Sequence, residues 1–223
     1  MIAALTGLIA GTLHVWSGPD HLAAIAPLAV RSPRRAWVPG TRWGIGHSAG
    51  VAVVGLLSLW LRDYLPLEKL SNWGESMVGV MLMGIGLWAV WKARKTKVHA
   101  HAHQHNGQPH VHLHVHPAQP APELVQVHRH AHVAFGIGIL HGLAGSSHFL
   151  GVLPVLALPT KAERVAYLAA FALGTIGSMA SFSALMGWLA TRFAKDGDRI
   201  YRGLMTCCGL AAMGVGLAWL VMS

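Results

Sequence analysis

The chain has 223 residues, of which 53% are hydrophobic and only 11% are charged, with a mean hydropathy of +0.47 and a formal net charge of +9. Soluble globular domains carry about 25% charged residues, so this composition excludes a water-soluble domain and indicates an integral membrane protein. The positive charge does not indicate nucleic-acid binding, because the basic residues gather in the loops between apolar segments.

Six apolar segments predict an all-α membrane protein with six transmembrane helices. The predicted spans are residues 2–30, 41–61, 75–91, 133–157, 165–190 and 203–222. The first and the fourth carry polar residues and glycine in their middle. Both are therefore predicted to be broken helices.

The first span contains the sequence His14-Val-Trp-Ser-Gly18-Pro-Asp20-His21. On an unbroken helix the two histidines would be separated by about 10.5 Å of rise, too far to bind one ion. Gly18-Pro19 permits local unwinding, which would bring His14, Asp20 and His21 around one point. Ionisable residues within a membrane are costly and usually handle an ion or a proton, so we predict a metal site here. Asp20 would be a ligand or would orient a histidine; the alternative is a His–Asp pair that only fixes the kink.

The second half repeats this motif as His141-Gly-Leu-Ala-Gly145-Ser-Ser-His148, with the histidines and the glycine at the same spacing as in the first copy. His141 and His148 are predicted to complete the same site or to gate the path to it. Alternatively, the small residues between them only permit close helix contact.

The second span adds one further candidate ligand, His47, between Gly46 and Ser48. A lone histidine in a helix is often a hydrogen-bonded core residue, and that remains the alternative. The other intramembrane histidines favour a role in the metal site.

A second match relates the third span to the sixth through their glycines and methionines, in the same order along the chain and at a similar separation. Three spans per half is an odd number, so the halves would enter the membrane in opposite senses, as a 3+3 inverted-topology repeat. The predicted organisation is a first repeat at 1–97, a loop at 98–132 and a second repeat at 133–223.

The loop between the repeats holds eleven of the 16 histidines and is interrupted by prolines. Its low complexity predicts a disordered segment that captures metal. A pH-responsive or merely solvated linker is the alternative. The histidines are His99, His101, His103, His105, His110, His112, His114, His116, His128, His130 and His132.

All but four of the 17 lysines and arginines lie in the loops after the first, third and fifth spans. The exceptions are Arg62, Lys69, Lys161 and Arg164. Cytoplasmic loops are enriched in basic residues, so the His-rich loop is predicted to be cytoplasmic and both termini outside. The predicted location is the inner (plasma) membrane of a bacterium.

The broken first span, with a histidine followed shortly by Asp20-His21, resembles the signature of the nickel/cobalt transporter superfamily. Gly46-His47-Ser48 resembles the second-span motif of that superfamily. The form His-Val-Trp-Ser-Gly-Pro-Asp-His-Leu is most similar to urease-accessory membrane proteins of the UreH type, although five residues rather than four separate His14 from Asp20. The resemblance implies metal-binding roles for His14, Asp20, His21 and His47.

The prediction is therefore a transporter, not an enzyme, that moves Ni²⁺ or Co²⁺ as its substrate, with Zn²⁺ as a further candidate and no permanently bound cofactor. The expected partners are the divalent ion, the lipid bilayer and nickel-enzyme maturation proteins. Efflux rather than uptake, a membrane zinc metalloenzyme, and a metal relay carried by the loop are the alternatives. No P-loop sequence is present, so ATP hydrolysis by that motif is excluded.

Overall fold

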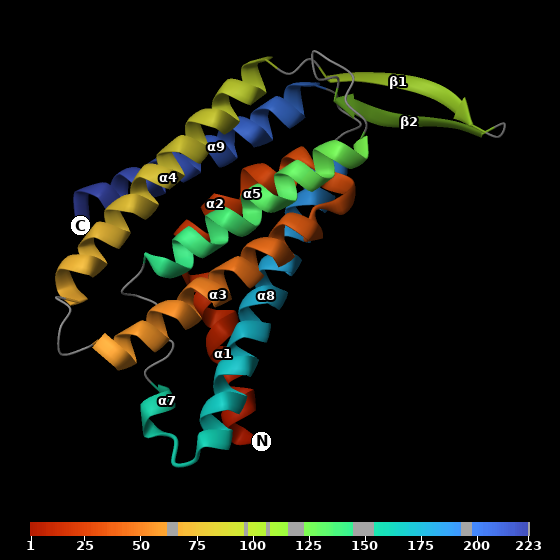
Figure 1. Ribbon diagram of the computed structural model, residues 1–223. Helices are drawn as coiled ribbons and strands as arrows, with labels where there is room; N and C mark the ends of the chain where they lie inside the picture. Colours follow the sequence, from red (N-terminus) through yellow and green to blue (C-terminus); the bar gives the residue numbers. More distant parts are fainter. Residues whose placement is uncertain are drawn as a thin grey trace.

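The computed structural model describes residues 1–61, 67–95, 98–105, 108–115, 123–144, 154–192 and 198–222. Long helices form the body of the molecule, and a two-stranded hairpin projects from one end (Figure 1). The elements in chain order are α1 (Ile2–Ser17), α2 (Pro19–Arg31), η1 (Pro33–Arg35), α3 (Trp37–Leu61), α4 (Leu67–Lys95), β1 (Val98–His105), β2 (Gln108–Val115), α5 (Glu123–Leu143), α7 (Pro154–Ala157), α8 (Lys161–Arg192) and α9 (Asp198–Met222).

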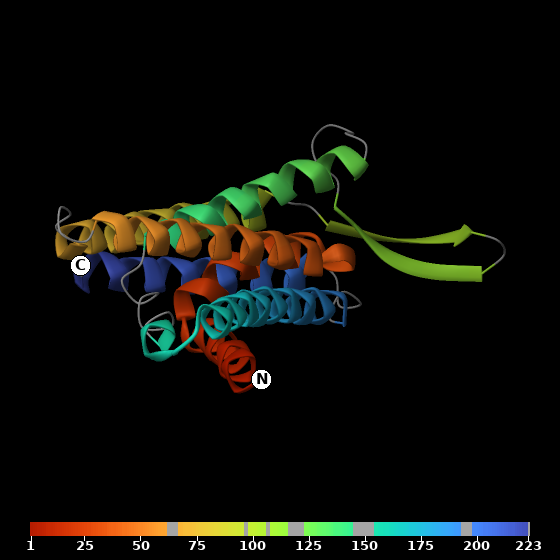
Figure 2. The ribbon, with the colours of Figure 1, turned by 60° about the horizontal axis from the view of Figure 1, so that its bottom comes forward.

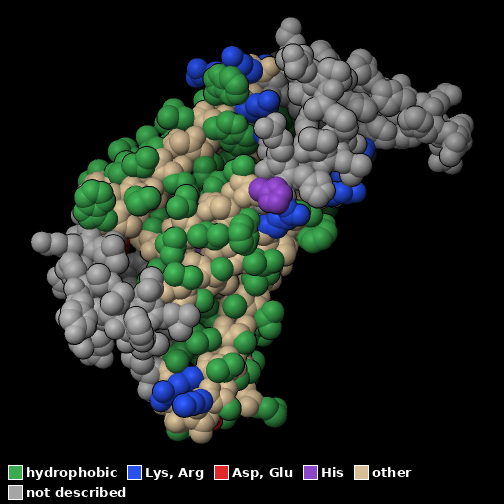
Figure 3. Space-filling view, in the orientation of Figure 1, with side chains coloured by type: hydrophobic (Ala, Val, Ile, Leu, Met, Phe, Trp, Pro, Cys, Tyr) green, Lys and Arg blue, Asp and Glu red, His purple; other side chains and the backbone are tan. Residues whose placement is uncertain are grey.

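Within the described residues, three helical segments are long and apolar enough to cross a membrane: Trp73–Lys95, Lys161–Arg192 and Ile200–Met222. Two shorter apolar helices, Ile2–Ser17 and His132–Leu143, lie in the predicted broken spans. Hydrophobic side chains cover much of the visible surface of the body (Figure 3). Such a surface suits a lipid environment, and the molecule is a multi-pass integral membrane protein.

The predicted break in the first span is confirmed. α1 ends at Ser17 and α2 begins at Pro19, with Gly18 between them in an extended conformation (φ −93°, ψ 97°). Proline suits the first position of a helix, where its missing N–H has no helical partner to lose. Figure 2 shows α1 leaving the bundle at an angle towards the N-terminus. In the fourth predicted span, α5 ends at Leu143, and residues 145–153 lie outside the described part.

α2 is the central helix, and nearly all of it is buried. Its Ala26 packs in one apolar cluster with Ala89 of α4 and Met205 of α9. Its Ile25 packs in another with Trp43 of α3. The start of α2, which carries Asp20 and His21, is thereby held inside the bundle.

The other helices pair closely: α1 with α8, α3 with α5, and α4 with α9. A Cβ added at Gly11 of α1 would meet the carbonyl oxygen of Phe171 in α8. A Cβ added at Gly138 of α5 would meet the carbonyl oxygen of Trp43 in α3. Gly138 is the counterpart of Gly11 in the repeat, and Phe171 is the counterpart of Trp43 when Gly46 of the second span is matched to Gly174 of the fifth. Corresponding regions of the two halves therefore make the same kind of contact.

The α4–α9 pair shows the same correspondence. Cβ atoms added at Gly79 and Gly216 would each approach the carbonyl oxygen of the other residue, and so would those at Gly86 and Gly209. In the match between the third and sixth spans, Gly79 corresponds to Gly209 and Gly86 to Gly216. Exchanging the two halves therefore turns one contact into the other.

The segment predicted as a disordered loop differs in the structure. β1 and β2 form an antiparallel hairpin, and α5 begins at Glu123, within the predicted loop. Strict alternation of histidine with alanine, valine or leucine is a strand pattern, and no proline interrupts the chain between Glu123 and Leu143. His99, His101 and His103 pair in register with His114, His112 and His110.

Candidate metal centre

Five of the six predicted intramembrane residues lie together in the structure. His14 comes from the last turn of α1, Asp20 and His21 from the first turn of α2, His47 from α3 and His141 from the last turn of α5. His14 is half-buried, and the other four are at most 5% exposed. Four separate helices thus contribute to one buried polar cluster.

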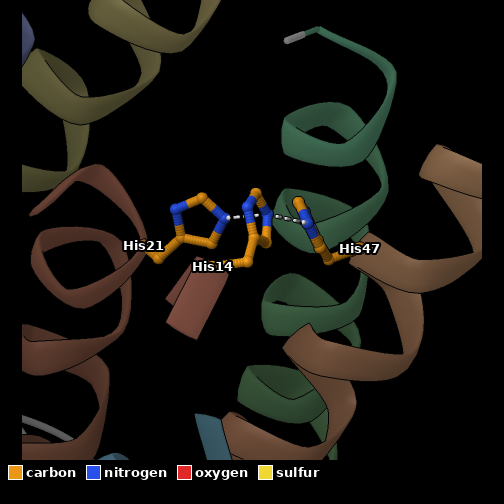
Figure 4. A group of neighbouring side chains, drawn as sticks. All are labelled: His14, His21 and His47. Carbon is orange, nitrogen blue, oxygen red and sulfur yellow. Dashed lines mark hydrogen bonds between the residues drawn. The ribbon is translucent and has the colours of Figure 1, made fainter. Parts of the chain in front are cut away.

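Three imidazole nitrogens converge within this cluster. His14 lies between His21 and His47 (Figure 4). Its Nε2 is 3.1 Å from Nε2 of His21 and 3.4 Å from Nε2 of His47. Nitrogens bound tetrahedrally at about 2.0–2.1 Å from a metal ion are themselves about 3.3–3.4 Å apart. These two separations suit ligands of one ion, and the ligand atoms of all three residues lie within 4.8 Å of one another.

Hydrogen bonds between neutral imidazoles cannot satisfy both contacts of His14 Nε2 well. Each ring nitrogen either donates one N–H or accepts through one lone pair, and not both. The Nε2 of His14 meets two other Nε2 atoms, so its single proton or lone pair would have to serve both contacts. A cation at the point of convergence uses the lone pairs of His14, His21 and His47 together.

Asp20 fixes the orientation of two histidines. Its Oδ1 is 2.9 Å from Nδ1 of His21, and its Oδ2 is 3.0 Å from Nε2 of His141. Since an ionised carboxylate only accepts hydrogen bonds, both imidazoles donate to it. Donation from Nδ1 leaves the lone pair of His21 on Nε2, directed towards His14. A carboxylate behind a ligating histidine is a common arrangement in metal sites.

The position of Asp20 is favourable for its charge. It lies in the first turn of α2, where the helix dipole and free N–H groups stabilise an anion. A buried carboxylate still requires compensation by neighbouring charge or hydrogen bonds. A divalent cation bound by the adjacent imidazoles would supply that compensation.

One residue that shapes this cluster, Trp43, was not predicted from the sequence. Trp43 is fully buried and stacks on His47, with ring centroids 4.8 Å apart and an interplanar angle of 9°. It precedes His47 by four residues, about one helical turn, and this spacing is the feature of the sequence that could have predicted the contact. At Gly18, an added Cβ would press against His21 Nδ1 and lie 2.9 Å from Asp20 Oδ1.

The remaining predicted metal-binding residues lie elsewhere. His148 and His116 fall outside the described residues. His128 and His130 lie in α5 rather than in a loop, and His132 is exposed on that helix. The hairpin carries the other seven, His99, His101, His103, His105, His110, His112 and His114.

The fold and the cluster define a multi-pass membrane protein with a buried histidine–aspartate centre. Residues 21–211 match the sequence family described as "Cytochrome C biogenesis protein transmembrane region". The chain belongs to this family. No solved structure matches it.

Three curated relatives add detail. The chain is 35% identical over 97% of its length to "Chloroplast protein FOR GROWTH AND FERTILITY 1" and 33% identical over 99% to "Chloroplast protein FOR GROWTH AND FERTILITY 2", both from Arabidopsis thaliana. It spans only 58% and 56% of these two proteins. It is 28% identical over 96% of its length, and 88% of the relative, to "Urease accessory protein UreH" of a Bacillus strain. None of these names, nor that of the family, designates an enzyme, which agrees with the prediction.

Proposed function

We propose that the chain transports a divalent transition-metal ion, Ni²⁺ or Co²⁺, across the membrane through the cluster formed by His14, Asp20, His21, His47 and His141. The observation that carries the proposal is the position of His14 Nε2, 3.1 Å from His21 Nε2 and 3.4 Å from His47 Nε2, with a buried carboxylate behind His21. Imidazole ligands suit Ni²⁺, Co²⁺ and Zn²⁺. A buried polar centre in a membrane protein marks an ion pathway more often than a structural device.

Similarity to the urease accessory protein UreH supports nickel as the cargo, because urease is a nickel enzyme. It also supports the membership in the nickel/cobalt transporter superfamily that the motifs suggest. On the basis of this similarity, the proposed partners are proteins that insert nickel into enzymes during their maturation.

The transporter would consist of six spans in a 3+3 inverted repeat. The corresponding glycine contacts of the two halves support this arrangement, because they relate α1–α8 to α5–α3. Discontinuous helices at the centre of such repeats commonly hold the transported ion. The Gly18 break, with His14 on one side and His21 on the other, fits that pattern.

The location would be a bacterial inner membrane, with the His-rich hairpin in the cytoplasm and both termini outside. The hairpin would capture metal beside the cytoplasmic opening.

Membrane vesicles of known orientation test the proposal. Right-side-out and inside-out vesicles containing the full chain should accumulate Ni²⁺ or Co²⁺ in one orientation, which also decides between uptake and efflux. His21→Ala should reduce accumulation to the background of empty vesicles. Ser17→Ala, which alters an exposed hydroxyl bonded to Leu13 O, is the matched control and should transport normally. Equal accumulation by wild type and His21→Ala would refute the proposal.

A further inference from the structure

The cluster contains two groups of ligand atoms rather than one. His14, His21 and His47 form the first group, and Asp20, His21 and His141 form the second. Within each group the ligand atoms lie within 4.8 Å of one another. Among the described residues, the five side chains do not form a single group at that limit, so they do not surround one point.

His21 belongs to both groups and presents a different ring nitrogen to each. Its Nε2 lies 3.1 Å from His14 Nε2 on one edge of the ring. Its Nδ1 lies 2.9 Å from Asp20 Oδ1 on the other edge. The carboxylate continues from there to His141 Nε2 at 3.0 Å. The two groups therefore lie on opposite sides of the His21 ring.

We propose that the ion occupies two successive positions, one on each side of the His21 ring. This inference rests on the proposed transport function and describes the path through that site. At the first position His14, His21 Nε2 and His47 bind the ion. At the second, His21 Nδ1, the Asp20 carboxylate and His141 bind it.

Burial gives the order of the two positions. His14 is half-buried, whereas all three members of the second group are buried. The first position is thus the one nearer to an entrance in this conformation. The second position also adds a negative ligand, which stabilises a dehydrated divalent ion in a low-dielectric setting.

The internal repeat also pairs His14 with His141, and the evidence for this comes from other contacts. His14 stands one helical turn after Gly11, and His141 stands one turn after Gly138. These two glycines make corresponding contacts with Phe171 and Trp43. Each half therefore contributes one terminal histidine, on either side of the shared His21. Passage from the first position to the second transfers the ion from a ligand of one half to a ligand of the other.

The chemistry of His21 limits occupancy to one ion. A neutral imidazole has a lone pair on only one of its two nitrogens. When Nε2 binds the ion, Nδ1 carries the proton and donates it to Asp20. When Nδ1 binds the ion, the proton is on Nε2, so His21 keeps the same number of protons in both states.

Binding measurements with Co²⁺ and Ni²⁺ test the two positions. The full chain is used with the eleven histidines of the predicted loop changed to serine, so that binding reports the buried cluster. This chain should bind one ion. His14→Ala and His141→Ala should each still bind one ion, because each leaves the other position intact. The double variant should lose at least about 100-fold in affinity, since even an outer partner of a ligand contributes 10–100-fold.

Asp20→Asn distinguishes the positions most sharply. Combined with His14→Ala it should abolish binding, because the remaining position needs the carboxylate as a ligand. Combined with His141→Ala it should leave binding detectable, because the asparagine oxygen still accepts the proton of His21 Nδ1. Every single variant should lose transport in the native chain, since the ion must pass both positions. Ser17→Ala should change neither binding nor transport.

Other outcomes overturn the inference in recognisable ways. If His14→Ala and His141→Ala each abolish binding while wild type transports, the transporter stands and a single position replaces the two. Two bound ions per chain, or equal effects of Asp20→Asn in both backgrounds, would also overturn it. Wild type without binding or transport would refute both proposals. His47→Ala is a second way to disable the first position should His14→Ala fail to elute as a folded protein in gel filtration.

Discussion

Asp20 is the residue on which the order of the cluster depends most. It is 5% exposed and bonds two imidazoles at once, one from its own helix and one from α5. Asparagine at this position keeps one acceptor oxygen but places an N–H₂ group against the second imidazole donor. Two donors facing one another leave a buried group unsatisfied, which is destabilising.

We therefore expect Asp20→Asn to lower the affinity of the otherwise native cluster for Ni²⁺ by about 10–100-fold, and Asp20→Ala to lower it further. Isothermal titration of the purified chain with Ni²⁺ measures this, with Ser17→Ala as the control. Wild-type affinity in Asp20→Asn would show that the carboxylate neither binds the ion nor orients its ligands.

Gly18 is the second residue with a specific steric role. A Cβ there would press against His21 Nδ1 and approach Asp20 Oδ1. Gly18→Ala should therefore displace the His21 ring and weaken metal binding, although its backbone angles suit alanine. Gly84→Ala is the matched control, because its added Cβ would meet nothing within 4 Å. The prediction fails if both variants bind Ni²⁺ equally well.

The helix pairs should respond to small changes in size where their backbones touch. In α5, a Cβ at Gly138 would meet the Trp43 carbonyl oxygen and lie 3.0 Å from His47 N, whereas one at Gly136 would meet nothing within 4 Å. Overpacking costs about 1–3 kcal/mol. Gly138→Ala should destabilise the protein by about that amount and Gly136→Ala should not, as measured by denaturation in detergent. Equal stability of the two variants would contradict the contact between α3 and α5.

The sequence predicts some of these elements well and others poorly, for physical reasons. The break at Gly18-Pro19 is local chemistry, so it could be read from two residues. The meeting of His141 with Asp20 depends on the packing of α5 against the bundle, and local patterns contain no such information. The hairpin was missed because its many histidines, and the prolines that follow it at 117, 120 and 122, outweighed the alternation that marks strands.

The ends of the helices were also predicted only in part. α4 extends over Leu67–Lys95, beyond the predicted span at 75–91, because hydropathy marks the part in lipid rather than the end of the hydrogen-bonded helix. The role of Trp43 depends on a ring stacked on His47, and nothing distinguishes it in sequence from the other eight tryptophans except its spacing.

At the scale of the whole molecule, the two ends of the bundle differ. The hairpin projects from the end at which α4 finishes and α9 begins (Figure 1). Lysines and arginines are visible near that end, and another group lies at the opposite end, over the end of α8 next to α7 (Figure 3). The chain's basic residues nevertheless favour the loops on the hairpin side, which the positive-inside rule assigns to the cytoplasm.

This assignment predicts the sidedness of two positions, Ser32 after α2 and Ser71 near the start of α4. With Cys207 and Cys208 first replaced by alanine, a cysteine at Ser32 should react with a membrane-impermeant reagent only from the cytoplasmic side. A cysteine at Ser71 should react only from the outside. Labelling of both positions from one side would refute the topology and the inverted repeat together.

The hairpin and the buried cluster should contribute to transport at different metal concentrations. Replacing residues 98–115 with a glycine–serine connector keeps α5, which begins at Glu123, and removes seven histidines. Since the buried ligands remain, transport at saturating Ni²⁺ should be close to that of wild type. At low Ni²⁺ it should fall, because the local supply of weakly bound metal is gone. The control is a chain in which the seven hairpin histidines are changed to serine, because it removes the ligands and keeps the hairpin residues. It should transport like the deletion variant at both metal concentrations. Loss of transport at all concentrations in a well-folded deletion would instead make the hairpin an obligatory relay for the ion.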